Sequence, residues 1–460
     1  MYKMPAANTR RANLILFLGL IIAFSIISFV AANTAFIVTN EIYSGVSVAD
    51  IPLGGLSVKE AEVKIRERIL NRMSQPIQLN YQDRTWPISL EEINVAIDTS
   101  SLAQKAYEVG RTGNIFQQLQ ERYLTVNRGY TIPIAVAYDT AKLELILQSI
   151  AQSLDTTARN ATLSYNGSEV TVIPEVIGKK LDINKTVAEI TAQLNNQLNF
   201  SVSLVVDEIN PAIYAADLSS IDSLIASYTT QFDAFNTNRA ENIQLAARSV
   251  NNTLVKQGDA FSFNRNVGLR LAEYGYKEAP VFIEGKIVPD WGGGVCQVSS
   301  TLYNAVLLAD MNIEERTSHF YPPGYVPIGQ DATVADNLLD FRFKNSTETN
   351  IYIKSEVSDD QLTIYILGKQ LENRPTIQVV AADTKVIEPK TIIKQDMTLD
   401  LGKQITEVEG QKGFHVTTYR IKKGSDGKEI SRELLANDEF KAVDKVIRVG
   451  TKALPQQKSK

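Results

Sequence analysis

The only cysteine in this 460-residue chain is the residue best placed to do chemistry. Cys296 follows a run of three glycines, Gly292 to Gly294, and precedes an apolar segment at residues 301–309 that predicts a helix. Glycine allows positive φ and close approach of neighbouring backbone. The first amides of a helix are unpaired and partly positive, so a thiol beside them ionises more readily than a free one. The pattern therefore predicts either an activated nucleophile or a tightly packed structural turn.

Two further residues could complete a cysteine-based acyl-transfer site. Such chemistry needs a base that forms the thiolate, a group that orients the base, and amides that hold an oxyanion. The chain has two histidines, and His319 is the one that follows Cys296 closely. His319 is predicted to act as the base and Asp331 to orient its ring, while Gly293 and Gly294 are candidate oxyanion donors. Papain-like and transglutaminase-like enzymes use a similar order of residues.

The same residues also allow a purely structural interpretation. Lone cysteines are among the most buried residue types and behave as small apolar side chains. Cys296 could belong to a core stripe along the predicted helix, formed by Val295, Val298, Leu302 and Val306. The glycines would then serve close packing, and His319 would be a hydrogen-bonded core imidazole. The sequence leaves both interpretations open, and whether the chain is an enzyme stays undecided at this point.

Other chemistries have weaker support in the sequence. Asp331, Asp336 and Asp340 could join His319 around a metal ion, but the chain lacks the His-x-x-x-His or paired-cysteine spacing of known metal sites. No metal and no cofactor are therefore predicted. Ser299 and Ser300 lie outside any Gly-x-Ser-x-Gly elbow, so a serine nucleophile is not predicted either.

The N-terminal region predicts a membrane anchor. Lys3, Arg10 and Arg11 precede a stretch from Ala12 to Asn40 that contains no charged residue. About 20 apolar residues suffice to span a bilayer as a helix, and positive charge before the span favours a cytoplasmic N-terminus. We therefore expect a cytoplasmic segment at residues 1–12, a single transmembrane helix at 13–38 and an extracytoplasmic remainder. A cleaved signal peptide is the alternative, although its apolar region is usually shorter, about 7–15 residues.

The charge balance and the cysteine count limit the classes of partner. The chain carries 47 Lys and Arg against 52 Asp and Glu, for a net charge of −5. It has no basic run of the kind that follows a phosphate backbone, so nucleic acid is not a predicted partner. A single cysteine cannot close an intrachain disulfide, and in an exported protein it is a candidate reactive thiol. The sequence does not predict an oligomeric state.

Residues 43–215 predict an α+β binding domain with an internal repeat. The first unit passes from Ile51 through a turn into a helix that Ser57 caps, with Glu60 three residues later completing a capping box. A second unit, residues 173–187, again leads from an Ile-Pro pair through a turn into a helical pattern. Repeated units without charge clusters favour a binding module.

The rest of the chain divides into two further regions and a tail. Residues 220–370 are rich in Asn, Gly and aromatic residues and contain Cys296 and His319. Residues 374–453 predict a small β-rich domain, because segments 376–380 and 415–421 alternate and Gly424 to Lys428 supplies a hairpin turn. Residues 454–460 are polar and predict a disordered tail.

Several motifs in the middle region resemble the VanW family. The segment from Gly292 to Ala305, GGGVCQVSSTLYNA, resembles the signature of that family. The resemblance continues upstream and downstream in order, through Phe261-Ser262-Phe263-Asn264, Val267-Gly268, Ser318-His319-Phe320, Gly329 to Val334 and Asp340 to Asn345. It covers about residues 236–368 and implies an α+β VanW domain.

The flanking regions resemble domains of cell-envelope proteins. The two Ile-Pro units, Trp86 to Ser89 and Gly110 to Asn114 are similar to the peptidoglycan-binding domain that precedes VanW in YoaR-like proteins. The C-terminal region is similar to the G-five domain of bacterial surface proteins, through Gly410 to Gly413, Thr418 to Ile421, Asp426 to Glu429 and Val449 to Thr451. The resemblance implies peptidoglycan or another cell-wall glycan as a partner.

Together these observations predict an α+β multidomain protein with one N-terminal transmembrane helix, a binding domain, a VanW domain and a β-rich C-terminal domain. The predicted function is peptidoglycan binding or cell-wall maintenance at the bacterial membrane. The alternative is a Cys296–His319–Asp331 acyl-transfer enzyme acting on peptidoglycan stem peptides, as an amidase, peptidase or transpeptidase.

Overall fold

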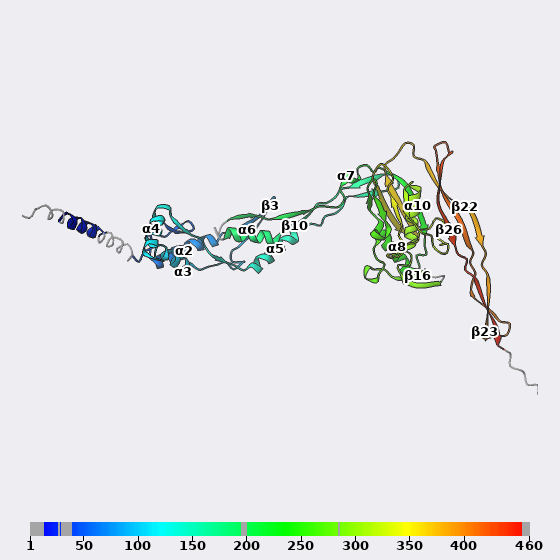
Figure 1. Cartoon of the computed structure of the whole chain (residues 1–460), viewed down its shortest axis with the longest axis horizontal. Coiled ribbons are helices and arrows are strands. Elements are labelled where there is room, and N and C mark those ends of the chain that lie inside the picture. Colours follow the sequence, from blue (N-terminus) through cyan, green and yellow to red (C-terminus); the bar gives the residue numbers. More distant parts are fainter. Residues whose placement is uncertain (1–12, 26–27, 29–38, 195–199, 284–285, 453–460) are drawn as a thin grey trace, which may run out of the picture. The chain divides into compact units, whose positions relative to one another are not determined.

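The computed structural model describes residues 13–25, 28, 39–194, 200–283 and 286–452 (Figure 1). The chain forms two compact units, the first from Met1–Thr157 with Ile177–Asn210 and the second from Ala158–Val176 with Pro211–Lys460. Helices and strands occur together in both units, so the predicted α+β multidomain class is confirmed. The predicted segments 1–12 and 454–460 lie outside the described residues.

The predicted membrane anchor at residues 13–38 is wrong, and with it the predicted single-pass localisation. Within the part of the chain that the structure describes, no helix combines the length and the apolar character that a membrane crossing needs. The described helix at the start of the chain covers residues 13–25. At 1.5 Å per residue it is roughly 20 Å long, against about 30 Å for the hydrocarbon layer. Residues 26–27 and 29–38 of the predicted span lie outside the described residues.

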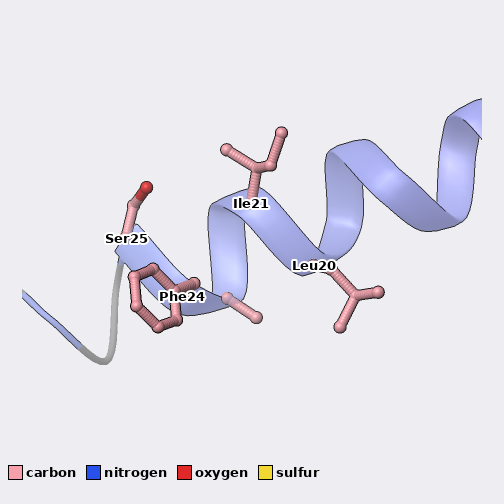
Figure 2. Close-up of a pocket in the computed structure, with 5 residues that line it drawn as sticks. Leu20, Ile21, Phe24 and Ser25 are labelled. Atoms are coloured by element: carbon pink, nitrogen blue, oxygen red, sulfur yellow. The ribbon is translucent and has the colours of Figure 1, made fainter.

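A hollow lies on the surface of this N-terminal helix (Figure 2). Leu20, Ile21, Phe24 and Ser25 project around the turns of the helix, and Ala23 completes the lining. These side chains offer one hydroxyl and otherwise only hydrocarbon. The hydroxyl of Ser25 has no acid or base beside it in this lining, so the hollow offers no assembled catalytic group.

The first unit surrounds one apolar core with short sheets and helices. Its helices are α2 (Val58–Met73), α3 (Thr99–Glu108), α4 (Ile115–Arg128), α5 (Thr140–Leu154) and α6 (Ile183–Leu194). Its strands are β1 (Val46–Val48), β2 (Ile51–Pro52), β3 (Ile77–Tyr81), β4 (Arg84–Ile88), β5 (Ala96–Ile97), β6 (Tyr130–Ile132), β7 (Val136–Ala137), β10 (Gly178–Leu181), β11 (Ser201–Ser203) and β12 (Val206–Ile209). They form small sheets in the orders β2-β1-β6, β11-β3-β4, β5-β7 and β10-β12.

The predicted helix starts of the repeat are confirmed in this unit. Ser57 caps α2 by accepting a hydrogen bond from the Glu60 amide, and the Glu60 carboxylate accepts one from the Ser57 amide. The second repeat leads through β10 into α6, where Ile190 and Leu194 are buried. Both helices turn an apolar stripe toward the same core, as their 3.6-residue periodicity dictates.

The second unit contains a helical and sheet part followed by a β module. Its helical elements are α7 (Ala215–Leu218), α8 (Thr237–Val250), α9 (Phe263–Val267), the 3₁₀ helix η1 (Ala272–Tyr274) and α10 (Val295–Leu308). The strands before the module are β8 (Thr162–Tyr165), β9 (Val170–Ile173), β13 (Ser223–Gln231), β14 (Thr253–Val255), β15 (Ala260–Ser262), β16 (Glu278–Ile283), β17 (Lys286–Trp291), β18 (Asn312–Glu315), β19 (Arg342–Lys344), β20 (Ile351–Ser358) and β21 (Gln361–Gly368).

Helix α10 is the central element of this unit. It packs with α8 on the four-stranded sheet β13-β21-β20-β14 (Figure 1). All of its residues are buried except Cys296 and Leu308, which are partly buried. A helix that is covered on all sides needs partners for its polar side chains as well as for its apolar ones. Those partners come from β13, from α8 and from the segment that carries the other candidate site residues.

The C-terminal β module comprises β22 to β27, as the alternating pattern predicted. Its strands are β22 (Thr376–Ile387), β23 (Thr391–Asp400), β24 (Gln404–Val408), β25 (Gly413–Lys423), β26 (Glu429–Phe440) and β27 (Lys445–Lys452). They form two sheets in the orders β22-β25-β26 and β23-β27-β24. The predicted turn joins β25 to β26, and Gly427 adopts a φ of +76° there.

Candidate functional site

Cys296 lies in the first turn of α10. The helix begins at Val295, earlier than the predicted start at residue 301, because Gly294 ends the preceding strand connection with a φ of +111°. No side chain caps this helix end. The thiol is therefore close to the amides of the first turn, whose partial positive charge favours an anion.

The glycine run is required by close packing. Gly292 has a φ of +77°, and a Cβ there would lie 2.8 Å from the Cβ of Arg270. A Cβ on Gly293 would lie 2.9 Å from the backbone and Cβ of Ala279. Asn242 of α8 is fully buried and donates to the Gly293 carbonyl at 3.0 Å. The run thus fixes the start of α10 against α8, as the structural interpretation of the sequence predicted.

The sulfur of Cys296 faces the segment that contains Asp331. Its thiol donates to the Val334 carbonyl at 3.4 Å and lies 3.7 Å from the Thr333 hydroxyl. The ring of His319 lies beside the thiol and acts on its ionisation. Cys296 packs against the core cluster but keeps partial solvent exposure. The sulfur therefore lies between the segment at residues 333–334 and the imidazole, in a residue that is partly exposed.

His319 connects the thiol to a buried carboxylate. Its Nδ1 lies 2.5 Å from Oδ2 of Asp331, and its backbone amide donates to the same oxygen at 2.7 Å. Because Nδ1 is used in this way, Nε2 is the ring nitrogen left for the thiol. The Tyr325 ring packs edge-on to the imidazole with centroids 6.5 Å apart. The structure thus brings together all three predicted residues, Cys296, His319 and Asp331.

The surroundings shift the pKa values of all three groups toward an ion pair. Burial opposes ionisation of Cys296, but the hydrogen bond and charge of His319 outweigh it and lower the thiol pKa to about 7. Burial likewise disfavours the imidazolium, yet Asp331 and Cys296 raise the pKa of His319 to about 9. The pKa of Asp331 is lowered, because His319 and Arg316 overcome the effect of its burial. Near neutral pH the site therefore favours thiolate beside imidazolium.

Asp331 is held from both sides by the protein. Arg316 donates from Nη2 to its carboxylate at 3.0 Å and from Nε to its backbone carbonyl at 2.6 Å. Its sequence neighbours are held by the polar side chains of α10. Asn304 donates to the Gln330 carbonyl at 2.7 Å, and Ser299 to the Ala332 carbonyl at 2.6 Å. The polar stripe of α10 thus fixes the position of Asp331 relative to Cys296, which begins the same helix.

The core stripe predicted for α10 is also confirmed. Val295, Val298, Leu302 and Val306 are all buried in one cluster, against which Cys296 packs. The other two carboxylates considered as metal ligands have different partners. Asp336 pairs with Arg270, and Asp340 accepts hydrogen bonds from Ser262 and from the amide of Asn264. Neither is directed to His319 by these contacts.

The sequence interpretation missed several residues around this site. Arg316 could have been noticed, because it is three residues before His319. Asp438 could not, since it pairs with Arg316 from 122 residues away in the β module. Arg239 of α8 reaches over the start of α10, where it donates to the side chain of Gln297 at 2.7 Å. No spacing rule links residues that meet only through the packing of separate elements.

Comparison with known proteins identifies three domain families in the predicted order. Residues 86–200 match the family described as "Putative peptidoglycan binding domain". Residues 238–367 match the family described as "VanW like protein", and residues 379–452 match the G5 domain. The candidate site lies within the second match, whereas Asp438 lies within the third.

Two curated proteins are similar to this chain. "Uncharacterized protein YoaR" of Bacillus subtilis is 32% identical over 272 residues, which cover 58% of this chain and 88% of that protein. "Vancomycin B-type resistance protein VanW" of Enterococcus faecalis is 30% identical over 151 residues, which cover 32% of this chain and 55% of that protein. A solved "IgA1 Protease G5 domain structure" shows 21% identity and a TM-score of 0.15 over 18% of this chain and 99% of its own, too low a score to weigh here.

The lowered thiol pKa leads to a first prediction. Since a thiolate is the reactive form, the alkylation rate of Cys296 should fall as the pH drops through about 7, instead of through about 8.5 as for a free cysteine. His319→Gln removes the imidazolium and should move this midpoint upward by at least about one pH unit. Iodoacetamide labelling followed by mass spectrometry measures this unambiguously, because the chain has one cysteine. His415→Gln is the control, and a wild-type midpoint above pH 8 would contradict the predicted ion pair.

A second prediction concerns the glycine at the start of α10. Gly294→Ala places a side chain at a φ of +111°, with its Cβ about 3 Å from Ile243 and Arg239. It should lower the free energy of unfolding by about 1–3 kcal/mol. Gly324→Ala is the matched control, since a Cβ there meets nothing within 4 Å and should change stability by less than about 0.5 kcal/mol. Denaturant titration of both variants checks this, and equal stabilities would refute the packing role.

Proposed function

We propose that this chain, which belongs to the VanW-like family together with YoaR of Bacillus subtilis, is a cell-wall protein whose Cys296 carries out acyl transfer on peptidoglycan stem peptides. The family predicted from the sequence is thereby confirmed, and its three domain types in this order are those of a cell-wall-associated protein. The observation that carries the proposed chemistry is the order of three groups: the Cys296 thiol lies beside His319, whose ring is hydrogen-bonded to the buried carboxylate of Asp331.

The proposed reaction begins with attack of the Cys296 thiolate on the carbonyl carbon of an amide bond in the stem peptide. The carbonyl π electrons move to oxygen, and a tetrahedral oxyanion forms. When the carbon–nitrogen bond breaks, the imidazolium of His319 gives its proton to the leaving amine. A thioester remains on Cys296. Asp331 holds Nδ1 throughout, so Nε2 is the nitrogen that exchanges the proton.

The second half of the reaction regenerates the thiol. Water or an amine of a second stem peptide attacks the thioester carbonyl, and neutral His319 takes the proton of this nucleophile. The carbon–sulfur bond then breaks, its electron pair stays on sulfur, and the thiolate beside the imidazolium is restored. Water gives hydrolysis, whereas the amine gives transpeptidation. The backbone amides of Gly293, Gly294 and Cys296 are the proposed donors for the oxyanion, because they surround the start of α10, where the helix dipole also favours negative charge.

A third prediction tests this chemistry directly. Cys296→Ala should lower the rate of amide cleavage or exchange in purified muropeptides by at least about 10³-fold, because the covalent step is lost. His319→Gln should lower the rate by about 10²–10⁴-fold. Mass spectrometry of the muropeptide products measures both effects, and His415→Gln should retain the wild-type rate. Absence of any product or acyl-enzyme across a panel of stem peptides with the wild-type chain would sink the acyl-transfer proposal.

Peptidoglycan binding without chemistry is the second candidate function. The match of residues 86–200 to a peptidoglycan-binding family supports it. So does a hollow of about 600 Å³ in that region, whose lining mixes amide, charged and ring side chains suited to a sugar or peptide; its residues include Gln117, Gln120, Glu121, Arg128 and Tyr130. A binding role of this hollow is compatible with chemistry at Cys296, because the two involve different domains.

A fourth prediction separates the two roles. Arg128→Ala should weaken sedimentation with purified sacculi by about tenfold, the effect of one lost hydrogen bond to a charged group. Lys105→Ala removes an exposed cation from α3, outside the hollow, and should bind like the wild type. Cys296→Ala should also bind normally. If Arg128→Ala and Lys105→Ala bind equally well, this hollow is not the binding surface.

A further inference from the structure

The C-terminal β module contacts the segment that carries His319 and Asp331 at several points. The Lys441 amide donates to the carbonyl of Phe320, next to His319, at 2.8 Å. The Thr418 hydroxyl lies against Gly329, two residues before Asp331, and would be 2.3 Å from a Cβ at that position. These contacts come from β25 and from the chain that follows β26. The module therefore packs directly on the backbone that positions the imidazole and its carboxylate.

The strongest contact across this junction is a buried arginine shared by two carboxylates. Arg316 donates from Nη1 to both carboxylate oxygens of Asp438 at 2.7 Å. Its Nε and Nη2 donate to the carbonyl and carboxylate of Asp331. The side chains of Arg316, Asp438 and Asp331 are 6%, 8% and 0% exposed. The Arg316 guanidinium also lies 5.5 Å from the centre of the Tyr303 ring.

We propose that Asp438 is a positioning residue of the cysteine site, so that the β module supplies one part of that site. Asp438 fixes the plane and the charge of Arg316, Arg316 fixes Asp331, and Asp331 fixes the ring of His319 that faces Cys296. The hydrogen bonds lead in this order from the module to the ring of His319, which lies beside the thiol and acts on its ionisation. What the thiol does rests on the acyl-transfer function proposed above, whereas the positioning itself does not.

Charge balance explains why Asp438 matters for the imidazole. Arg316 carries one positive charge and pairs with two carboxylates, Asp331 and Asp438. The three groups together keep a net negative charge, and this charge stabilises an imidazolium at His319. Without the Asp438 carboxylate, Arg316 would be compensated by Asp331 alone, which would then be a weaker partner for His319. In a buried site such a change is little screened by water.

Other ionisable groups also lie near Cys296 and His319. Cys296 faces His319 from α10, and Arg239 of α8 affects the charge of Cys296. The partly buried Tyr325 lies beside both Cys296 and His319, and the pKa of its phenol is raised well above its usual value by desolvation. Substitution of Asp438 changes none of these groups, so an altered His319 reports on the connection through Arg316.

The test follows the titration of the two histidines in the full-length chain. Histidine-labelled protein gives two ring signals, and His415→Gln assigns them. Asp438→Asn should lower the pKa of His319 by at least about one pH unit and slow the alkylation of Cys296 at pH 7 severalfold. Asp438→Glu should restore part of both values. Glu433→Gln is the matched control, because Glu433 lies on the same strand and pairs with the buried Arg420 instead of Arg316.

The outcomes distinguish this inference from the proposed function. If His319 of the wild type titrates near its ordinary pKa, the ion pair of the proposed function fails, together with what depends on it. The second outcome is that the pKa of His319 is raised in the wild type but is the same in Asp438→Asn as in Glu433→Gln. In that case the inference is overturned and the proposed function stands. His415, opposite Glu439 on the neighbouring strand, reports whether the module keeps its fold. Should Asp438→Asn unfold it, Asp438→Ser removes the same charge with a smaller side chain, and a His319 pKa equal to that of Glu433→Gln in this variant overturns the inference.

Discussion

The buried carboxylate of Asp331 is the constraint on which this site depends. An ionised carboxylate without solvent contact is stable only when its oxygens are paired, and here they accept from the amide and ring of His319 and from Arg316. Because Asp331 is fully buried, water cannot take the place of these partners. The need to satisfy one charge therefore fixes the ring orientation of His319, and through it the surroundings of the Cys296 sulfur.

Cys296 and His319 could be singled out because their residue types are rare, since cysteine occurs once in the chain and histidine twice. Asp331 was predicted from its place just after the turn at Gly329, close to His319 in the chain. Arg316 and Asp438 could not be predicted in the same way. Arginine and aspartate are common, and the contact between them arises only when the β module packs on α10 and the segment that follows it.

Sequence signals that act over a few residues predicted helix starts correctly, whereas the signal for a long membrane-spanning helix gave a wrong prediction. The capping box at Ser57 and Glu60 sets the start of α2, because both hydrogen bonds form within one turn. The membrane anchor at residues 13–38 was inferred from the absence of charge, which does not determine how far a helix continues. Among the described residues, no helix has both the length and the apolar character that a membrane crossing needs.

The structural interpretation of Cys296 and the catalytic role proposed for it do not exclude each other. The glycines that pack α10 against α8 also put the thiol in the first turn of the helix. The polar stripe that satisfies α10 in the core also holds the backbone on both sides of Asp331. A site built from core contacts loses little conformational freedom when it reacts, because its groups are already oriented. The same packing makes the site sensitive to distant elements, and this explains how a β module could become part of it.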